Sequence, residues 1–189
     1  MESTARLFHE SVAALAQERP DAIAIASEKQ TLTYRELDRA ATRLAHFLRK
    51  QGVTPEARVA VCLGQSHELV VAFLGILKSR GTYLPMDPAL PDKRLRFMLE
   101  DGGAVAVLTD ASSTHRIPPG LSTFALEPDL KLLTGESDQT LQCEPGRDSV
   151  AYAIYTSGST GLPKAVLMDL VCEWSAEWWA AASSKPRTA

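Results

Sequence analysis

Cysteine is scarce in this 189-residue sequence, and long apolar runs and an excess of basic residues are missing. Its cysteines, Cys62, Cys143 and Cys172, lie far apart and form no CxxC pair, so neither a disulfide framework nor a zinc site is indicated. The longest apolar stretch, Leu69–Leu77, is much shorter than the roughly 20 residues that span a bilayer. The polar, acidic start of the chain is unlike a secretory signal. A net charge of -3 does not suggest a basic face for nucleic acid.

What is present is the composition of a globular protein, with 45% hydrophobic and 23% charged residues. Because thiols that are few and unpaired are typical of a reducing compartment, we expect a cytoplasmic protein that binds neither membranes nor nucleic acid. The four histidines are scattered without the spacing of metal ligands, and they predict no metal site: His9, His46, His67 and His115.

Strand and helix patterns alternate through the middle of the chain. Apolar runs typical of buried strands occupy Arg58–Leu63, Tyr83–Met86 and Ala104–Thr109, and helical patterns fill Ser66–Lys78 and Asp92–Asp101 between them. Strands that alternate with helices of this length favour right-handed crossovers and a parallel sheet. The sequence therefore predicts an α/β fold with a βαβαβ unit over residues 58–109.

Local signals mark where several helices begin and end. Thr33 and Glu36 have the spacing of a capping box, in which each side chain accepts a hydrogen bond from the other residue's backbone N–H. The helix over Ser66–Lys78 is predicted to be amphipathic and to be closed by Gly81. Asp92 is interpreted as a helix cap and not as a catalytic carboxylate.

The two ends of the predicted α/β unit are less regular. Ser3–Glu18 has helical spacing and Ala22–Ser27 reads as a strand. Proline and glycine punctuate Ala111–Gly146, which we interpret as loops around one short strand at Thr123–Leu126. Val150–Tyr155 (VAYAIY) is then a clear apolar strand.

A segment rich in glycine and hydroxyl groups, TSGSTGLPK, follows this strand directly and ends at Lys164. Gly158 and Gly161 can adopt positive φ and let the backbone approach a ligand, while exposed N–H groups in such a turn form a nest for phosphate oxygens. Hydroxyl groups add donors and the lysine adds a positive charge. The sequence thus predicts an anion-binding loop made of Thr156, Ser157, Gly158, Ser159, Thr160, Gly161 and Lys164.

Three other interpretations of this segment fit less well. A Walker-type loop has four residues between its glycines followed at once by Lys and Ser or Thr, whereas Lys164 here precedes Ala165. A lipase-type nucleophile elbow needs glycine two residues before its serine, and Ser159 has Ser157 there. A plain Ser/Gly turn between two strands is the remaining alternative, and the lysine and the preceding buried strand argue against it.

Three stretches in order resemble motifs of the adenylate-forming superfamily, the AMP-dependent synthetases and ligases. YTSGSTGLPK (Tyr155–Lys164) resembles its phosphate-loop signature, LTYREL (Leu32–Leu37) an early core motif, and LKSRGTYLPMDP (Leu77–Pro88) a third. The wording of the third motif is closer to amino-acid-activating domains, such as those of nonribosomal peptide synthetases, than to acyl-CoA synthetases. Residues 1–168 therefore resemble the N-terminal portion of such a domain, truncated and with an incomplete sheet.

The resemblance implies a reaction and its reactants. A carboxylate, in this branch that of an amino acid, attacks the α-phosphate of ATP with Mg²⁺, forming an acyl-AMP and pyrophosphate, and the product passes to a carrier-protein thiol. The loop would hold the departing phosphates. The family's adenine site, metal-binding carboxylate and adenylation lysine lie beyond Lys164, so the resemblance assigns no catalytic and no metal-binding residue here.

Residues 169–189 do not match the family pattern, and we expect this tail to be poorly ordered. It contains all three tryptophans, Trp174, Trp178 and Trp179. One interpretation is a short docking helix, and the other is a shifted reading frame or a mispredicted exon end.

Several functions remain open at this point. The chain is expected to be a fragment of an amino-acid-activating adenylation domain that is inactive alone. The alternatives are a non-enzymatic fragment that pairs with a complementary chain or a carrier protein, a fragment of an acyl-CoA synthetase-type ligase, and a complete small ATP-binding enzyme.

Overall fold

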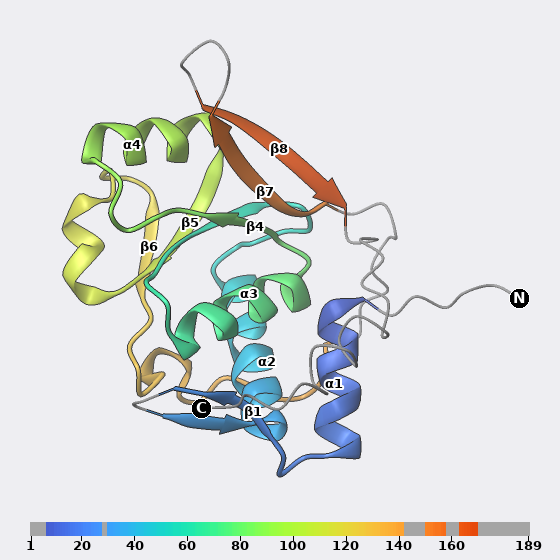
Figure 1. Cartoon of the computed structure of the whole chain (residues 1–189). Helices are drawn as coiled ribbons and strands as arrows, with labels where there is room; N and C mark the ends of the chain where they lie inside the picture. The colour runs from blue at the N-terminus through green and yellow to red at the C-terminus, as the bar shows by residue number, and fades with distance from the viewer. Residues whose placement is uncertain (1–6, 28–29, 142–149, 158–162, 170–189) are drawn as a thin grey trace, which may run out of the picture.

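The computed structural model describes residues 7–27, 30–141, 150–157 and 163–169 (Figure 1). The predicted start of the first helix at Ser3 lies outside these residues, as does the tail over residues 170–189. The elements, in chain order, are α1 (Phe8–Glu18), β1 (Ile23–Ala26), β2 (Thr31–Thr33), α2 (Tyr34–Lys50), β3 (Arg58–Cys62), α3 (His67–Ser79), β4 (Thr82–Pro85), α4 (Asp92–Asp101), β5 (Ala104–Thr109), the 3₁₀ turn η1 (Ala111–Arg116), β6 (Ser122–Ala125), the 3₁₀ turn η2 (Lys131–Leu133), β7 (Val150–Ser157) and β8 (Pro163–Asp169).

The larger sheet has six strands in the order β6-β5-β3-β4-β7-β8. The first five strands run parallel to their neighbours, and β8 is antiparallel to β7. The chain passes from β3 through α3 to β4 on one side, then through α4 to β5 on the other side of β3. The predicted βαβαβ unit over residues 58–109 and the α/β class are therefore confirmed. A separate antiparallel pair, β1 and β2, lies near α1 and α2 (Figure 1).

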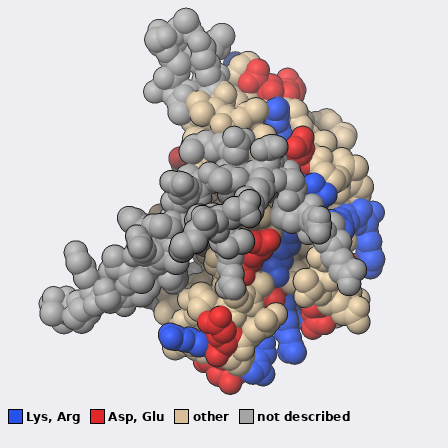
Figure 2. All heavy atoms as spheres, turned by 90° about the vertical axis from the view of Figure 1, so that its right-hand side faces the viewer, with Lys and Arg blue, Asp and Glu red and all other residues tan. Residues whose placement is uncertain are grey.

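Side chains of both charge signs lie intermixed on the described part of the face that Figure 2 shows. Ion pairs tie α2 to the segment after η2, with Lys50 Nζ 2.8 Å from Glu136 Oε2 and Arg43 Nη2 3.5 Å from Asp138 Oδ2. Within the described ranges, no helix combines the length and apolar character that crossing a bilayer requires.

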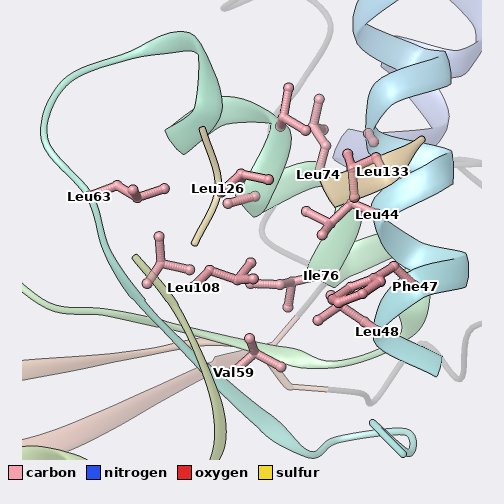
Figure 3. Packing of buried hydrophobic residues seen from close by; sticks show 14 of the residues in the cluster. Leu44, Phe47, Leu48, Val59, Leu63, Leu74, Ile76, Leu108, Leu126 and Leu133 are labelled. Atoms are coloured by element: carbon pink, nitrogen blue, oxygen red, sulfur yellow. The ribbon is translucent and has the colours of Figure 1, made fainter. Parts of the chain in front are cut away.

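Both faces of the parallel sheet are covered, and strand β3 shows how. Val59 and Val61 belong to the cluster formed with α2 and α3, whereas Ala60 and Cys62 belong to the cluster formed with α4. Successive side chains of a strand point to opposite faces, so a strand buried on both sides reads as a continuous apolar run. Figure 3 shows the first cluster, in which side chains of α2 and α3 pack over β3 and β5.

Helix α3 differs from the predicted amphipathic helix. Nine of its residues are buried, on all sides of the helix, because α2 packs on one side and the sheet on the other: His67, Glu68, Val71, Ala72, Leu74, Gly75, Ile76, Leu77 and Ser79. A helix that is apolar all round is typical of a buried position. The prediction of an amphipathic helix was therefore wrong, although its limits were nearly correct.

Two further local predictions need correction. The left-handed residue that ends α3 is Arg80, with φ of 68°, and not Gly81, whose Cβ position would lie 3.2 Å from the Ala57 carbonyl oxygen. Asp92 caps no helix with its side chain, because its carboxylate pairs with Arg116 Nε at 2.8 Å. The capping box is confirmed: Glu36 N–H donates to Thr33 Oγ1 at 3.3 Å, and Thr33 N–H to Glu36 Oε2 at 2.9 Å.

His9 on α1 is expected to make the fold sensitive to acid. Burial lowers its pKa from 6.5 to about 4, and its Nδ1 atom has no hydrogen-bond partner among the described residues. Between about pH 6.5 and pH 4, His9 is therefore protonated in the unfolded chain but still neutral in the folded chain. Protonation favours the unfolded chain in this window, so the free energy of unfolding is highest above about pH 6.5 and decreases as the pH falls toward 4. We expect the free energy of unfolding to drop by about 2 kcal/mol between pH 7 and pH 5.

Urea unfolding at both pH values measures this effect in the wild type and in His9→Gln, whose side chain does not titrate. The variant should lose much less stability over the same range. His115→Gln, at an exposed site, is the matched control and should behave like the wild type. An equal loss in all three proteins would show that His9 is not the group responsible.

Candidate functional site

A cavity of about 620 Å³ opens where the chain leaves strands β3 and β4. Its wall includes Leu63 and Gln65 after β3, and Met86 and Asp87 after β4. These neighbouring strands continue into α3 and α4, which cover opposite faces of the sheet. Ligands of open α/β sheets bind at such a switch point, outside the carboxyl ends of the strands. The fold thus places this cavity where a ligand is expected.

The cavity is mainly apolar, with a few polar groups on its wall. Gln65, Asp87 and Arg94 supply these groups among side chains such as Leu69 and Met98. Asp87 also shapes the turn after β4, because its Oδ1 accepts a hydrogen bond of 2.8 Å from the Ala89 N–H. A mostly apolar pocket with a few polar groups is typical of small-molecule sites.

Arg116 fixes the loop that forms one wall of the cavity. Its guanidinium donates to the Pro88 carbonyl at 2.5 Å, to the Leu90 carbonyl, and to Asp92 Oδ1 at 2.8 Å. The hydrogen bond from Arg116 holds the pKa of the Asp92 carboxyl below its usual value. Pro88 and Leu90 both line the cavity. Arg116 therefore connects η1 to the β4–α4 loop and sets the shape of this wall.

The segment predicted to bind phosphate begins at the rim of the same cavity. Ile154 and Tyr155 on β7 line the cavity, and Thr156 follows them in the chain. Thr156 pairs with Lys164 across β7 and β8, and only the backbone of these two residues and of Ser157 is described. Gly158, Ser159, Thr160 and Gly161 lie outside the described residues. Strand β8 follows the segment, and β7 extends to Ser157, two residues further toward the segment than the predicted strand Val150–Tyr155.

No group of three or more His, Cys, Asp or Glu side chains that could hold a metal ion occurs among the described residues. Sequence reasoning also missed Gln65, Asp87 and Arg94 as members of a site. The signal that could have identified two of them is their position just after predicted parallel strands, where α/β folds bind ligands.

Comparison with known proteins places this geometry in context. Residues 12–170 match the protein family described as AMP-binding enzyme. Over 159 residues the chain is 45% identical to a linear gramicidin synthase of Brevibacillus parabrevis, a match that covers 84% of this chain and 2% of that protein. Over 168 residues it is 42% identical to bacitracin synthase 3 of Bacillus licheniformis, covering 86% of this chain and 2% of that protein.

Solved structures show the same relationship. A nonribosomal peptide synthetase, FmoA3, in its AMPPNP-bound form superposes with a TM-score of 0.80 at 35% identity, covering 89% of this chain and 18% of that one. The O-succinylbenzoate coenzyme A synthetase MenE of Bacillus subtilis, in complex with AMP, has a TM-score of 0.74 at 27% identity, covering 95% of this chain and 45% of that one. The chain thus spans less than half the length of each of these relatives.

Proposed function

The chain belongs to the AMP-binding enzyme family, and from this premise we propose that it is the N-terminal portion of an adenylation domain that activates an amino acid with ATP. Residues 1–168 form this portion in our proposal, and residues 169–189 are a tail outside the family pattern. The choice of an amino acid is supported by the 45% and 35% identities to peptide synthetases, against 27% to a coenzyme A synthetase. A fragment of an acyl-CoA synthetase-type ligase is the less favoured alternative.

The observation that carries the proposal is the position of the Thr156–Lys164 segment. It connects two strands at the rim of the switch-point cavity, and its first member follows the cavity residue Tyr155. In the proposed reaction the substrate carboxylate attacks the α-phosphate of ATP, and pyrophosphate leaves. Backbone N–H groups, the hydroxyl groups of the segment and Lys164 stabilise the charge on the leaving phosphates by electrostatic interaction and by positioning, without proton transfer.

ATP normally enters such reactions with Mg²⁺. The described residues contain no group of three or more His, Cys, Asp or Glu side chains that could hold this ion, so no residue of this chain is proposed as its ligand. The carrier protein that would accept an activated amino acid is a further part of the proposal, as is a complementary fragment that would complete the fold.

A chimera tests the proposed function. Residues 12–170 replace the matching segment of an adenylation domain of the linear gramicidin synthase, and amino-acid-dependent exchange of labelled pyrophosphate into ATP is measured. We expect exchange in the chimera and a loss of about 100-fold in Lys164→Ala, by analogy with the loss of one preorganised donor at a reacting centre. Lys131→Ala removes an exposed lysine and is the matched control. The proposal would be refuted by a folded chimera that shows no pyrophosphate exchange, or by a chimera whose exchange is unchanged in Lys164→Ala.

A further inference from the structure

The antiparallel pair of β7 and β8 is attached to the rest of the sheet at few points. Backbone pairing between β4 and β7 involves one pair of residues, Tyr83 opposite Tyr152. The Thr82 hydroxyl adds a hydrogen bond of 3.1 Å to the Val150 carbonyl. Both contacts lie in the first half of β7. The second half, which leads to the predicted phosphate segment, lies beyond this pairing.

The Tyr155 side chain supplies this second attachment. Its hydroxyl oxygen lies 2.7 Å from Asp101 Oδ2 and 3.2 Å from the Met98 carbonyl oxygen. The distance to the Asp101 carboxylate is the shorter of the two and its oxygen carries the negative charge, so we assign the single hydroxyl proton to Asp101. The distance is that of a charge-assisted hydrogen bond. Burial raises the pKa of Tyr155, and the hydrogen bond to Asp101 raises it further, so the hydroxyl keeps its proton.

The end of helix α4 is shaped to receive this hydroxyl. A Cβ atom on Gly102 would lie 2.6 Å from the Met98 carbonyl oxygen, 2.9 Å from Leu84 Cδ2 and 3.3 Å from the Tyr155 hydroxyl. The Gly102 carbonyl accepts a hydrogen bond of 2.8 Å from Arg58 Nη1 on β3. The helix end that holds Tyr155 is therefore itself fixed to the centre of the sheet.

We propose that Tyr155 is a positioning residue: its hydrogen bond to Asp101 fixes the second half of β7 against α4 and so holds the described ends of β7 and β8, Ser157 and Pro163, from which the predicted phosphate segment starts. The attachment rests on the described contacts, and only its effect on ligand binding rests on the proposed function. Tyr155 acts through the strand that it holds, and it transfers no group or proton.

Hydrogen exchange in the 189-residue chain tests the attachment directly. Tyr155→Phe keeps the ring that packs against the α4 cluster and removes the hydroxyl alone. We expect the amides of β7 and β8 to exchange at least about tenfold faster in the variant, while those of β3 and β5 remain unchanged. Asp101→Ala should have the same effect and add little to Tyr155→Phe. Tyr152→Phe, on the same strand, is the matched control.

Binding of magnesium pyrophosphate, measured by calorimetry, separates the two proposals. The expected result is a several-fold weaker affinity in Tyr155→Phe than in the wild type and in Tyr152→Phe. Unchanged exchange in β7 and β8, or equally faster exchange in β3 and β5, would overturn the positioning role. A third outcome is that amide hydrogen exchange in Tyr155→Phe becomes faster only in β7 and β8, while the wild-type chain does not bind pyrophosphate. This outcome would support the attachment and count against the proposed function of the segment.

Discussion

Gly75→Ala is expected to destabilise the fold by about 1–3 kcal/mol, although alanine is the better helix former. In an open helix interior the change would stabilise by about 1 kcal/mol. Gly75, however, lies in α3 against α2, and a Cβ atom there would stand 2.7, 2.8 and 2.9 Å from Cδ2, Cγ and Cβ of Leu44. The Leu44 side chain is fully buried and its Cβ cannot rotate away, so the helices must separate (Figure 3). Steric overlap therefore outweighs helix propensity.

Denaturant unfolding of the wild type and four variants measures this effect. Leu44→Ala alone should cost about 2–5 kcal/mol through the cavity it leaves. In the double variant the new methyl group enters that cavity. The double variant should therefore lose less stability than the sum of the losses in the two single variants. Gly64→Ala is the matched control, because nothing lies within 4 Å of its Cβ position, and it should be close to neutral. Strict additivity of Gly75→Ala and Leu44→Ala would mean that the two residues do not compete for one space.

The central part of the fold could be predicted because each element carries its own local signal. Strand β5 has its predicted limits because it is a continuous apolar run. Helix α4 has its predicted limits because two glycines follow it directly. Strand β2 was missed because three residues, Thr31–Thr33, are too few to show a period. The character of α3 was missed for a different reason: whether a helix is buried on all sides depends on α2, whose packing no local pattern reports.

The candidate site could likewise be predicted only where its residues are close together in the sequence. The Thr156–Lys164 segment could be identified because glycines, hydroxyls and a lysine stand together in the sequence. The cavity beside it is lined by residues that follow β3 and β4 and by residues of β7. No local sequence pattern indicates that these three strands are neighbours in the sheet. The Tyr155–Asp101 hydrogen bond joins residues 54 positions apart and gives no sequence signal. The same holds for Arg116 and the carbonyls that it binds.

The largest expected effect concerns catalysis by the 189 residues alone. We expect the purified chain to show no amino-acid-dependent exchange of pyrophosphate into ATP. In the proposed function the Thr156–Lys164 segment binds the phosphates, but the reaction requires both reactants to be held together in a near-attack geometry. Such positioning supplies roughly 7–11 kcal/mol, or more than about 10⁵-fold in rate. The chain corresponds to 45% of MenE and 18% of FmoA3, so more than half of each relative has no counterpart in these 189 residues.

The described surface supports the same expectation. Val166 and Leu167 on the edge strand β8 are 46% and 48% exposed, and Ile154 on β7 is 41% exposed. Uncovered apolar side chains on a sheet edge favour association with another chain, so we expect the isolated chain to associate and a complementary fragment to bind there. Exchange is therefore measured with the chain alone and with Lys164→Ala, each in a mixture of amino acids. Strong exchange by the wild-type chain that disappears in Lys164→Ala would show that these residues form a complete minimal enzyme, and the view of the chain as one part of an adenylation domain would have to be abandoned.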